Sequence, residues 1–136
     1  MRGSVRDLCF PGTCRVCGRV LIGQEKMMCL PCLYDLPRTY HWIFPFHFLT
    51  EILSCMPSCT WATSFLFFRE ESPYRKLLHR FKYGGEKEIG LYMGFLYGKE
   101  LLRSHKTPPN PVIIPVPMSS LKRRKRGYNQ AEWLAA

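Results

Sequence analysis

Apolar positions recur with a helical period at the start of the second half of the chain. A helix over residues 72–83 would carry its apolar side chains on one face: Tyr74, Leu77, Leu78 and Phe81. Ser72 suits the N-cap and Pro73 the first helical position, and the pair Gly84-Gly85 is typical of a helix end. The pattern therefore predicts an amphipathic helix here.

A second helical pattern covers residues 86–104. Its apolar stripe consists of Ile89, Tyr92, Met93, Leu96 and Leu101. Gly90, Gly94 and Gly98 recur every fourth residue, although a glycine inside a helix costs about 1 kcal/mol relative to alanine. Either another backbone packs very closely against this row, or tertiary packing tolerates a weak local propensity.

The period changes again after this helix. Residues 107–111 form a proline-rich linker, and the β-branched run at 112–116 predicts a buried strand with Pro115 near its end. Residues 117–127 predict a basic loop, and Asn129 with Glu132 resembles a capping box that opens another helix. This order is typical of the opening of an α/β domain with a parallel sheet, so we expect the front part of a longer protein.

The first 71 residues have a different character. Residues 1–40 are rich in cysteine and turn formers, too few to bury a core of their own, and contain a short apolar run at 20–22 that could form a strand. Residues 41–71 are aromatic and poor in charge, with a predicted buried strand at 61–68. We therefore divide the chain into a cysteine-rich module (1–40), an aromatic connector (41–71) and an incomplete α/β domain (72–136).

Four of the seven cysteines follow a metal-binding spacing. Cys14 and Cys17 form one Cys-x₂-Cys pair, and Cys29 and Cys32 form a second pair after eleven intervening residues. Two such pairs supply the four thiolates of a tetrahedral zinc site. Because protein would fill all four positions, this arrangement predicts a structural zinc ion rather than a catalytic one.

Three cysteines remain outside this pattern. The spacing of Cys55 and Cys59 suits a helix, so together with His41 or His47 they could bind a second metal, or they could be small core residues together with Cys9. No arrangement of nucleophile and base stands out, and we name no catalytic residue.

The charge of the chain is strongly basic, with a formal net charge of +10. No acidic residue lies between Glu100 and Glu132, whereas seven basic ones do: Arg103, Lys106, Lys122, Arg123, Arg124, Lys125 and Arg126. Such a zone attracts phosphate-bearing partners, although a solubilising surface loop has the same composition. The longest apolar stretch is far shorter than the roughly 20 residues that span a bilayer, and no signal peptide is evident, so we expect a cytoplasmic protein.

Three stretches together resemble the ComF family of competence-associated, phosphoribosyltransferase-like proteins. They are the four-cysteine pattern, residues 72–85 and residues 114–135. The most specific parts are Lys-Tyr-Gly at 82–84 and Arg-Gly-Tyr-Asn-Gln at 126–130. The resemblance implies an N-terminal zinc module followed by a type I phosphoribosyltransferase fold.

The resemblance also implies a role and a ligand. It implies action in DNA uptake, in the cytoplasm and at the inner membrane, with a competence helicase or single-stranded DNA-handling proteins as partners. It places a pyrophosphate-type anion near Pro117, Met118, Ser119, Ser120, Lys125 and Arg126. Mg²⁺ and phosphoribosyl pyrophosphate would also need an acidic pair and a Thr-Thr-Gly-like loop, which this sequence lacks. We therefore expect no transferase turnover from this chain.

Two other interpretations stay open at this point. The chain could be a non-catalytic zinc-ribbon module that binds nucleic acid or a helicase partner, with aromatic side chains that stack on bases. Most of its aromatic residues, however, lie in 40–83, away from the basic run, where a core position is expected. Alternatively, the chain does not fold stably alone, and its strand at 112–116 promotes aggregation.

Overall fold

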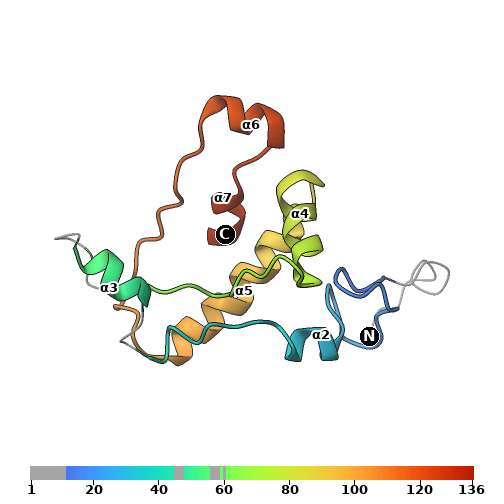
Figure 1. Cartoon of the computed structure of the whole chain (residues 1–136), viewed down its shortest axis with the longest axis horizontal. Helices are drawn as coiled ribbons and strands as arrows, with labels where there is room; N and C mark the ends of the chain where they lie inside the picture. The colour runs from blue at the N-terminus through green and yellow to red at the C-terminus, as the bar shows by residue number, and fades with distance from the viewer. Residues whose placement is uncertain (1–11, 45–47, 56–58, 60) are drawn as a thin grey trace.

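The protein is helical in the part that the structure describes. A computed structural model describes residues 12–44, 48–55, 59 and 61–136 (Figure 1). Its helices are α2 (Leu30–Tyr34), α3 (Phe48–Ser54), α4 (Tyr74–Tyr83), α5 (Lys87–Arg103), α6 (Ser120–Arg126) and α7 (Gln130–Ala135). Strand pairing within these ranges is limited to two isolated bridges, Thr13 with Val20 and Arg38 with Leu66. The described residues thus contain no parallel sheet.

Helix α4 confirms the amphipathic pattern of the sequence. Tyr74, Leu77 and Phe81 are buried on one face. At its start the backbone N–H of Tyr74 donates to the Ser72 hydroxyl at 3.3 Å, although Pro73 rather than Ser72 is the N-cap residue. At its end the N–H of Gly84 donates to the carbonyl of Arg80, which satisfies one of the last carbonyls of the helix.

Helix α5 lies at the centre of the molecule, with α4 and α7 beside it (Figure 1). A Cβ atom added at Gly94 would lie 2.2 Å from the backbone oxygen of Leu134 in α7. A Cβ atom at Gly90 would lie 2.6 Å from the ring of Phe81, whereas one at Gly98 would meet nothing within 4 Å. Close packing therefore explains two of the three glycines, and the third is a position of weak propensity only.

Helix α7 begins at the cap that the sequence predicts. The Asn129 side chain accepts a hydrogen bond from the N–H of Ala131 at 3.1 Å. Its amide group donates to Glu132 at 3.3 Å and to the carbonyl of Val116 at 3.0 Å. Asn129 thus starts the helix and also ties the preceding extended segment to it.

The segment at 112–116 is extended, but it is not a buried strand. Val112 is 84% exposed and Ile114 is 80% exposed, and no strand pairs with this segment among the described residues. A strand is buried only when its neighbours cover both faces, and the described structure supplies none.

The basic stretch at 117–127 is also different from the expected loop, because residues Ser120–Arg126 form helix α6. Leucine, lysine and arginine are strong helix formers. Gly127 ends the helix in the left-handed conformation at φ 79°, and its N–H donates to the carbonyl of Arg123 at 2.7 Å.

The expected buried strand at 61–68 is likewise absent. The segment 61–68 makes one bridge, between Leu66 and Arg38, and its residues Phe67 and Phe68 are exposed. Its aromatic residues instead join a cluster on α5: the ring of Phe65 stacks on Tyr97 at 4.9 Å, and both rings lie 5.7 Å from the buried ring of Trp42. The aromatic connector is thus held by side-chain packing rather than by a sheet.

A core cluster of described residues joins the cysteine-rich loops to the helices. It consists of Cys14, Val16, Met28, Cys29, Leu36, Tyr74, Leu77, Phe81, Ile89, Met93 and Tyr128. The loops before residue 40 and the helices after residue 72 therefore bury their apolar side chains against one another. The division at 40 and 71 stays a prediction.

Candidate metal centre

The first cysteine pair lies on a tight turn. The N–H of Gly18 donates to the carbonyl of Cys14 at 2.9 Å, and the N–H of Cys14 donates to the carbonyl of Arg19 at 2.7 Å. Gly18 has a φ of 77°, a left-handed conformation that glycine adopts without steric cost. This turn brings the sulfur atoms of Cys14 and Cys17 to the same side of the chain.

The second cysteine pair lies at the start of α2. Cys29 is the N-cap residue, and the N–H of Leu33 donates to its carbonyl at 2.9 Å. Pro31 occupies the first turn, where the missing N–H of proline removes no helical hydrogen bond. One helical turn then places Cys32 beside Cys29.

The four predicted ligands come together. The sulfur atoms of Cys14, Cys17, Cys29 and Cys32 all lie within 4.8 Å of one another, and all four thiols are free of disulfides. The Cys17 and Cys29 sulfur atoms are 3.6 Å apart. Tetrahedral zinc with bonds of about 2.3 Å requires sulfur atoms about 3.8 Å apart. The cluster therefore fits a metal ion such as zinc.

The protein environment gives these thiols different proton affinities. Burial alone would raise the pKa of Cys14, but backbone N–H groups of Cys17, Cys29 and Val16 lower it to about 6. One of these donors, the Cys29 N–H, lies 3.4 Å from the Cys14 sulfur. Burial raises the pKa of Cys32, and the neighbouring thiols raise it further. Cys14 is thus already largely a thiolate, whereas Cys32 must release its proton to solvent when a metal binds.

Glu25 holds the loop between the two cysteine pairs, a role that the sequence analysis did not assign. Its carboxylate oxygens accept hydrogen bonds from the N–H of Leu30 at 2.6 Å and of Ile22 at 2.9 Å. These two bonds lower the pKa of Glu25, so the carboxylate stays charged. Its sequence signal is an acidic residue shortly before the second cysteine pair, where it satisfies a free N–H at the start of α2.

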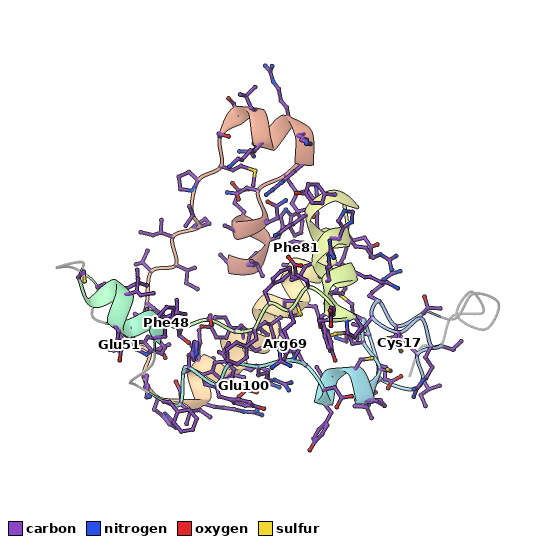
Figure 2. The ribbon with its side chains drawn as sticks, viewed as in Figure 1. Cys17, Phe48, Glu51, Arg69, Phe81 and Glu100 are labelled. Carbon is purple, nitrogen blue, oxygen red and sulfur yellow. The ribbon has the colours of Figure 1, made fainter. Side chains whose placement is uncertain are left out.

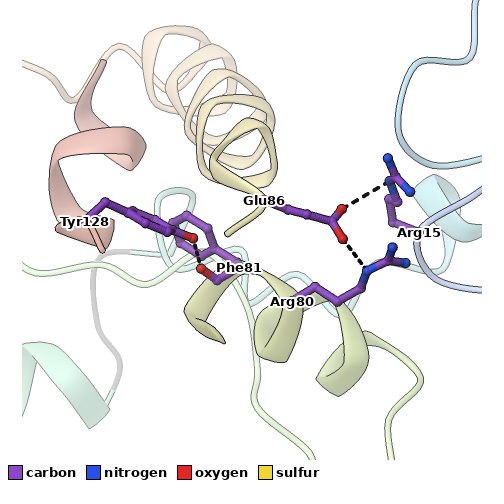
Figure 3. A network of polar contacts seen from close by, with 5 residues as sticks. All are labelled: Arg15, Arg80, Phe81, Glu86 and Tyr128. Carbon is purple, nitrogen blue, oxygen red and sulfur yellow. Dashed lines mark hydrogen bonds and ion pairs between the residues drawn. The ribbon is translucent and has the colours of Figure 1, made fainter. Parts of the chain in front are cut away.

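Polar contacts attach the cysteine loops to the helical body. The hydroxyl of Tyr74 in α4 donates to the carbonyl of Cys32 at 2.7 Å. Glu86, at the start of α5, accepts from Arg15 of the first cysteine loop at 3.3 Å and from Arg80 of α4 at 2.5 Å (Figure 3). The metal centre is therefore tied to both α4 and α5.

The predicted anion-binding residues lie in one continuous segment. Pro117, Met118 and Ser119 precede α6, Ser120 begins it, and Lys125 and Arg126 lie in its last turn. The guanidinium of Arg126 is directed at other partners. It lies 5.4 Å from the centre of the Tyr83 ring and donates to the Gln130 side chain at 3.1 Å. Pyrophosphate binding at this segment stays a prediction.

A second metal cluster is not formed among the residues that the structure describes. Cys55 is exposed and follows α3, and Cys59 donates to the carbonyl of Trp61 at 3.7 Å. In Figure 2, Phe48 and Glu51 of α3 lie at the opposite end of the molecule from Cys17. His41 contacts the Ser64 hydroxyl at 3.0 Å, and Cys9 and His47 lie outside the described residues.

Comparisons with protein-family models, with curated proteins and with solved structures give no match for this chain. None of the helices in the described ranges has the length and apolar character that crossing a membrane requires.

Proposed function

We propose that this chain is a ComF-like protein of DNA uptake, in which a structural zinc ion holds the cysteine loops against the helices. The observation that carries the proposal is the cluster of four cysteines, which fits a closed tetrahedral shell with no position for substrate. In this proposal the chain contributes a scaffold with a phosphoribosyltransferase-like sequence, and it transfers no ribosyl group.

Contacts between the two most specific motifs support the resemblance. The first motif contains Lys82 and Tyr83, and the second contains Arg126, Tyr128 and Gln130. Arg126 lies over the Tyr83 ring, and the Gln130 side chain donates to the carbonyl of Lys82 at 3.5 Å. The Tyr128 hydroxyl donates to the carbonyl next to the first motif, at Phe81 (Figure 3). Two motifs more than 40 residues apart thus form one structural unit.

The expected lack of transfer rests on the carboxylates. After Glu100 the only acidic residue is Glu132, and this side chain already accepts from Asn129 and lies 3.9 Å from Arg123. No second carboxylate adjoins it in the sequence, so the ribose hydroxyls and Mg²⁺ of phosphoribosyl pyrophosphate would lack their acidic pair.

Two measurements on the purified chain test the proposal. Metal analysis should find a single zinc ion per chain, and incubation with Mg²⁺ and phosphoribosyl pyrophosphate should release no pyrophosphate above the protein-free rate. In the source organism, deletion of the gene should lower transformation by added DNA, and the wild-type gene should restore it. Normal transformation after deletion would contradict the role in DNA uptake, and steady pyrophosphate release would contradict the absence of transfer.

A second candidate function is a non-catalytic module that binds single-stranded nucleic acid. The observation that favours it is a row of two rings and a guanidinium group from α4 to α6. The His79 ring lies 5.0 Å from the Tyr83 ring, and the guanidinium of Arg126 lies over the same tyrosine. The two helices that supply these groups also carry other cationic residues: Arg75, Lys76 and Lys82 in α4, and Lys122 and Arg123 in α6. Aromatic rings beside cations are the usual means of binding single strands.

Binding to a fluorescent oligothymidine tests this second candidate. Affinity should fall steeply with salt, with a slope of about −0.7 per phosphate contact. Tyr83→Ala should weaken binding, whereas Tyr34→Ala, which removes an exposed ring from the cysteine-rich part, should leave it unchanged. Affinity that is independent of salt, or equally reduced by both variants, would exclude the module.

A further inference from the structure

The four cysteines of the metal centre differ in their access to solvent. Cys14 is 2% exposed and Cys29 is 1% exposed, whereas Cys32 is half-buried and Cys17 is exposed. In Figure 2, Cys17 lies at one end of the molecule, away from the helices α6 and α7 that are labelled in Figure 1. A small oxidant in solution therefore reaches the sulfur of Cys17 before it reaches the buried sulfur atoms.

The turn that carries Cys17 leaves this residue more room to move than Cys29 has. Gly18 is exposed, and a Cβ atom added there would meet nothing within 4 Å. Cys29 is the N-cap residue of α2, and the N–H of Leu33 donates to its carbonyl at 2.9 Å. Its own N–H is directed at the sulfur of Cys14 at 3.4 Å. Cys17 is thus the member of the cluster that can approach a fixed partner.

The sulfur of Cys29 is close enough to Cys17 to serve as that partner. The two sulfur atoms are 3.6 Å apart. A disulfide requires about 2.05 Å, so a closing movement of about 1.5 Å would suffice. A bond between these residues takes one ligand from each Cys-x₂-Cys pair, and neither pair could then hold a metal ion with both of its sulfur atoms.

We propose that Cys17 and Cys29 are a site of oxidation, at which a peroxide converts the two ligands into a disulfide and so releases the zinc ion. This inference rests on the structural zinc ion of the proposed function. It goes beyond that function because it makes zinc binding, and with it the attachment of the cysteine loops to the helices, sensitive to oxidants. The site consists of residues 14–32 alone.

The reaction transfers two electrons from two sulfur atoms to the peroxide. The Cys17 thiolate attacks one peroxide oxygen, the O–O bond breaks, and the departing hydroxide takes up a proton, which leaves Cys17 as a sulfenic acid. The Cys29 thiolate then attacks the Cys17 sulfur, the S–O bond breaks, and the second hydroxide also takes up a proton. One hydrogen peroxide and two protons thus give one disulfide and two water molecules. The two remaining cysteines are too few for the four-coordinate shell of structural zinc.

Two histidine variants of the full chain test the pair, because histidine can replace cysteine as a zinc ligand but forms no disulfide. Hydrogen peroxide is added to the zinc-loaded chain, and a chromogenic chelator measures the zinc released. Cys17→His removes the exposed sulfur and should slow the release about tenfold or more. Cys32→His keeps both members of the pair and should release zinc within about threefold of the wild-type rate. A dithiol reductant and added zinc should restore the zinc content of the wild-type chain.

Peptide mapping identifies the pair directly. Trypsin cleaves after lysine and arginine, so Cys17 falls in fragment 16–19, and Cys29 and Cys32 fall in fragment 27–38. Mass spectrometry of the oxidised wild-type chain should find these two fragments joined by a disulfide. The same cross-link in Cys32→His would have to use Cys29, because no other cysteine remains in the second fragment.

The zinc content before oxidation separates this inference from the proposed function. A chain that binds no zinc contradicts both. A zinc-loaded chain overturns only the oxidation site if it keeps its zinc in peroxide, if Cys17 stays a free thiol, or if fragment 16–19 is joined to the fragment that contains Cys14. Equal rates of release from the two histidine variants would also overturn it. If the histidine variants do not hold zinc, the peptide map of the wild-type chain decides.

Discussion

The cysteines of the metal centre differ in what they offer to an ion. Cys14 is buried and has a pKa of about 6, so at neutral pH its sulfur is mostly a thiolate. Burial and the neighbouring thiols raise the pKa of Cys32, so this ligand is protonated until a metal displaces the proton. Metal binding should therefore release protons, and the affinity for zinc should fall as the pH drops through about 6, where Cys14 also becomes protonated.

The first prediction concerns a single ligand. Cys17→Ser removes one thiolate from the cluster and should lower the affinity for zinc by at least about 100-fold, because a ligand matters at least as much as its supporting groups. Competition with a chromogenic chelator measures the loss. Cys55→Ser is the matched control, since Cys55 is exposed and lies outside the cluster. Equal losses in the two variants would mean that zinc binds elsewhere.

The second prediction concerns Glu25, which supports the metal centre but is not a member of the cysteine cluster. Glu25→Ala removes both hydrogen bonds that hold the loop between the cysteine pairs, to Ile22 and Leu30. Loss of such a supporting group typically costs about 10–100-fold in metal affinity. The same chelator competition measures it, and unchanged affinity would show that the loop holds its shape without this carboxylate.

At the scale of a single helix, substitutions in the glycine row of α5 can separate the effect of close packing against α7 from the effect of helix propensity. Gly94→Ala would place a Cβ atom against the backbone of Leu134, so α7 must shift, and we expect a loss of about 1–3 kcal/mol in the free energy of unfolding. Gly98→Ala meets nothing within 4 Å and should stabilise the protein by up to about 1 kcal/mol. Urea unfolding measures both. Stabilisation by both substitutions would show that helix propensity alone governs this row.

The attachment of α4 to the second cysteine pair should depend on pH. Burial, reinforced by the nearby negative groups, raises the pKa of Tyr74 to about 12, compared with about 10 in the unfolded chain. The folded state holds this proton more tightly, so its stabilisation is fully present below pH 10 and is lost as the pH rises toward 12. Chemical unfolding from pH 8 upward should show this decline. Tyr74→Phe, which also lacks the bond to Cys32, should decline less.

At the scale of the whole molecule, the core is continuous but thin. The chain exposes 10697 Å², whereas a compact monomer of 16.0 kDa exposes about 7,400 Å². Two cysteines of the metal centre, Cys14 and Cys29, are members of the same core cluster as Leu77 and Ile89. A molecule with so little buried area depends on each part of its core, including the metal centre.

Zinc removal should therefore loosen the helices as well as the cysteine loops. A strong chelator should increase amide hydrogen exchange in α4 and α5, and added zinc should restore protection. Unchanged exchange in these helices, with loss of protection confined to residues 12–36, would show that the metal centre is an independent unit. The same experiment tests the alternative that the chain does not fold stably alone, because such a chain would show no protection even with zinc bound.

Local sequence patterns determined much of this protein. The spacing of the cysteines predicted the members of the cluster, because a Cys-x₂-Cys turn brings two sulfur atoms together without help from distant residues. Helices α4, α5 and α7 followed from periodicity and from the residues at their ends, which act within one or two turns. The sequence predicts a basic loop at 117–127, whereas Ser120–Arg126 form helix α6, because leucine, lysine and arginine are also strong helix formers.

Only the tertiary structure decided which surfaces meet. The β-branched residues at 112–116 predict a buried strand, but these residues are exposed. Whether a strand is buried depends on the segments that pack against it, which its own residues do not specify. The role of Glu25, the close approach of α7 to Gly94 and the contact of Arg126 with Tyr83 likewise join residues through folding. A local pattern specifies the conformation of a segment, whereas contacts between distant segments depend on the geometry of the whole chain.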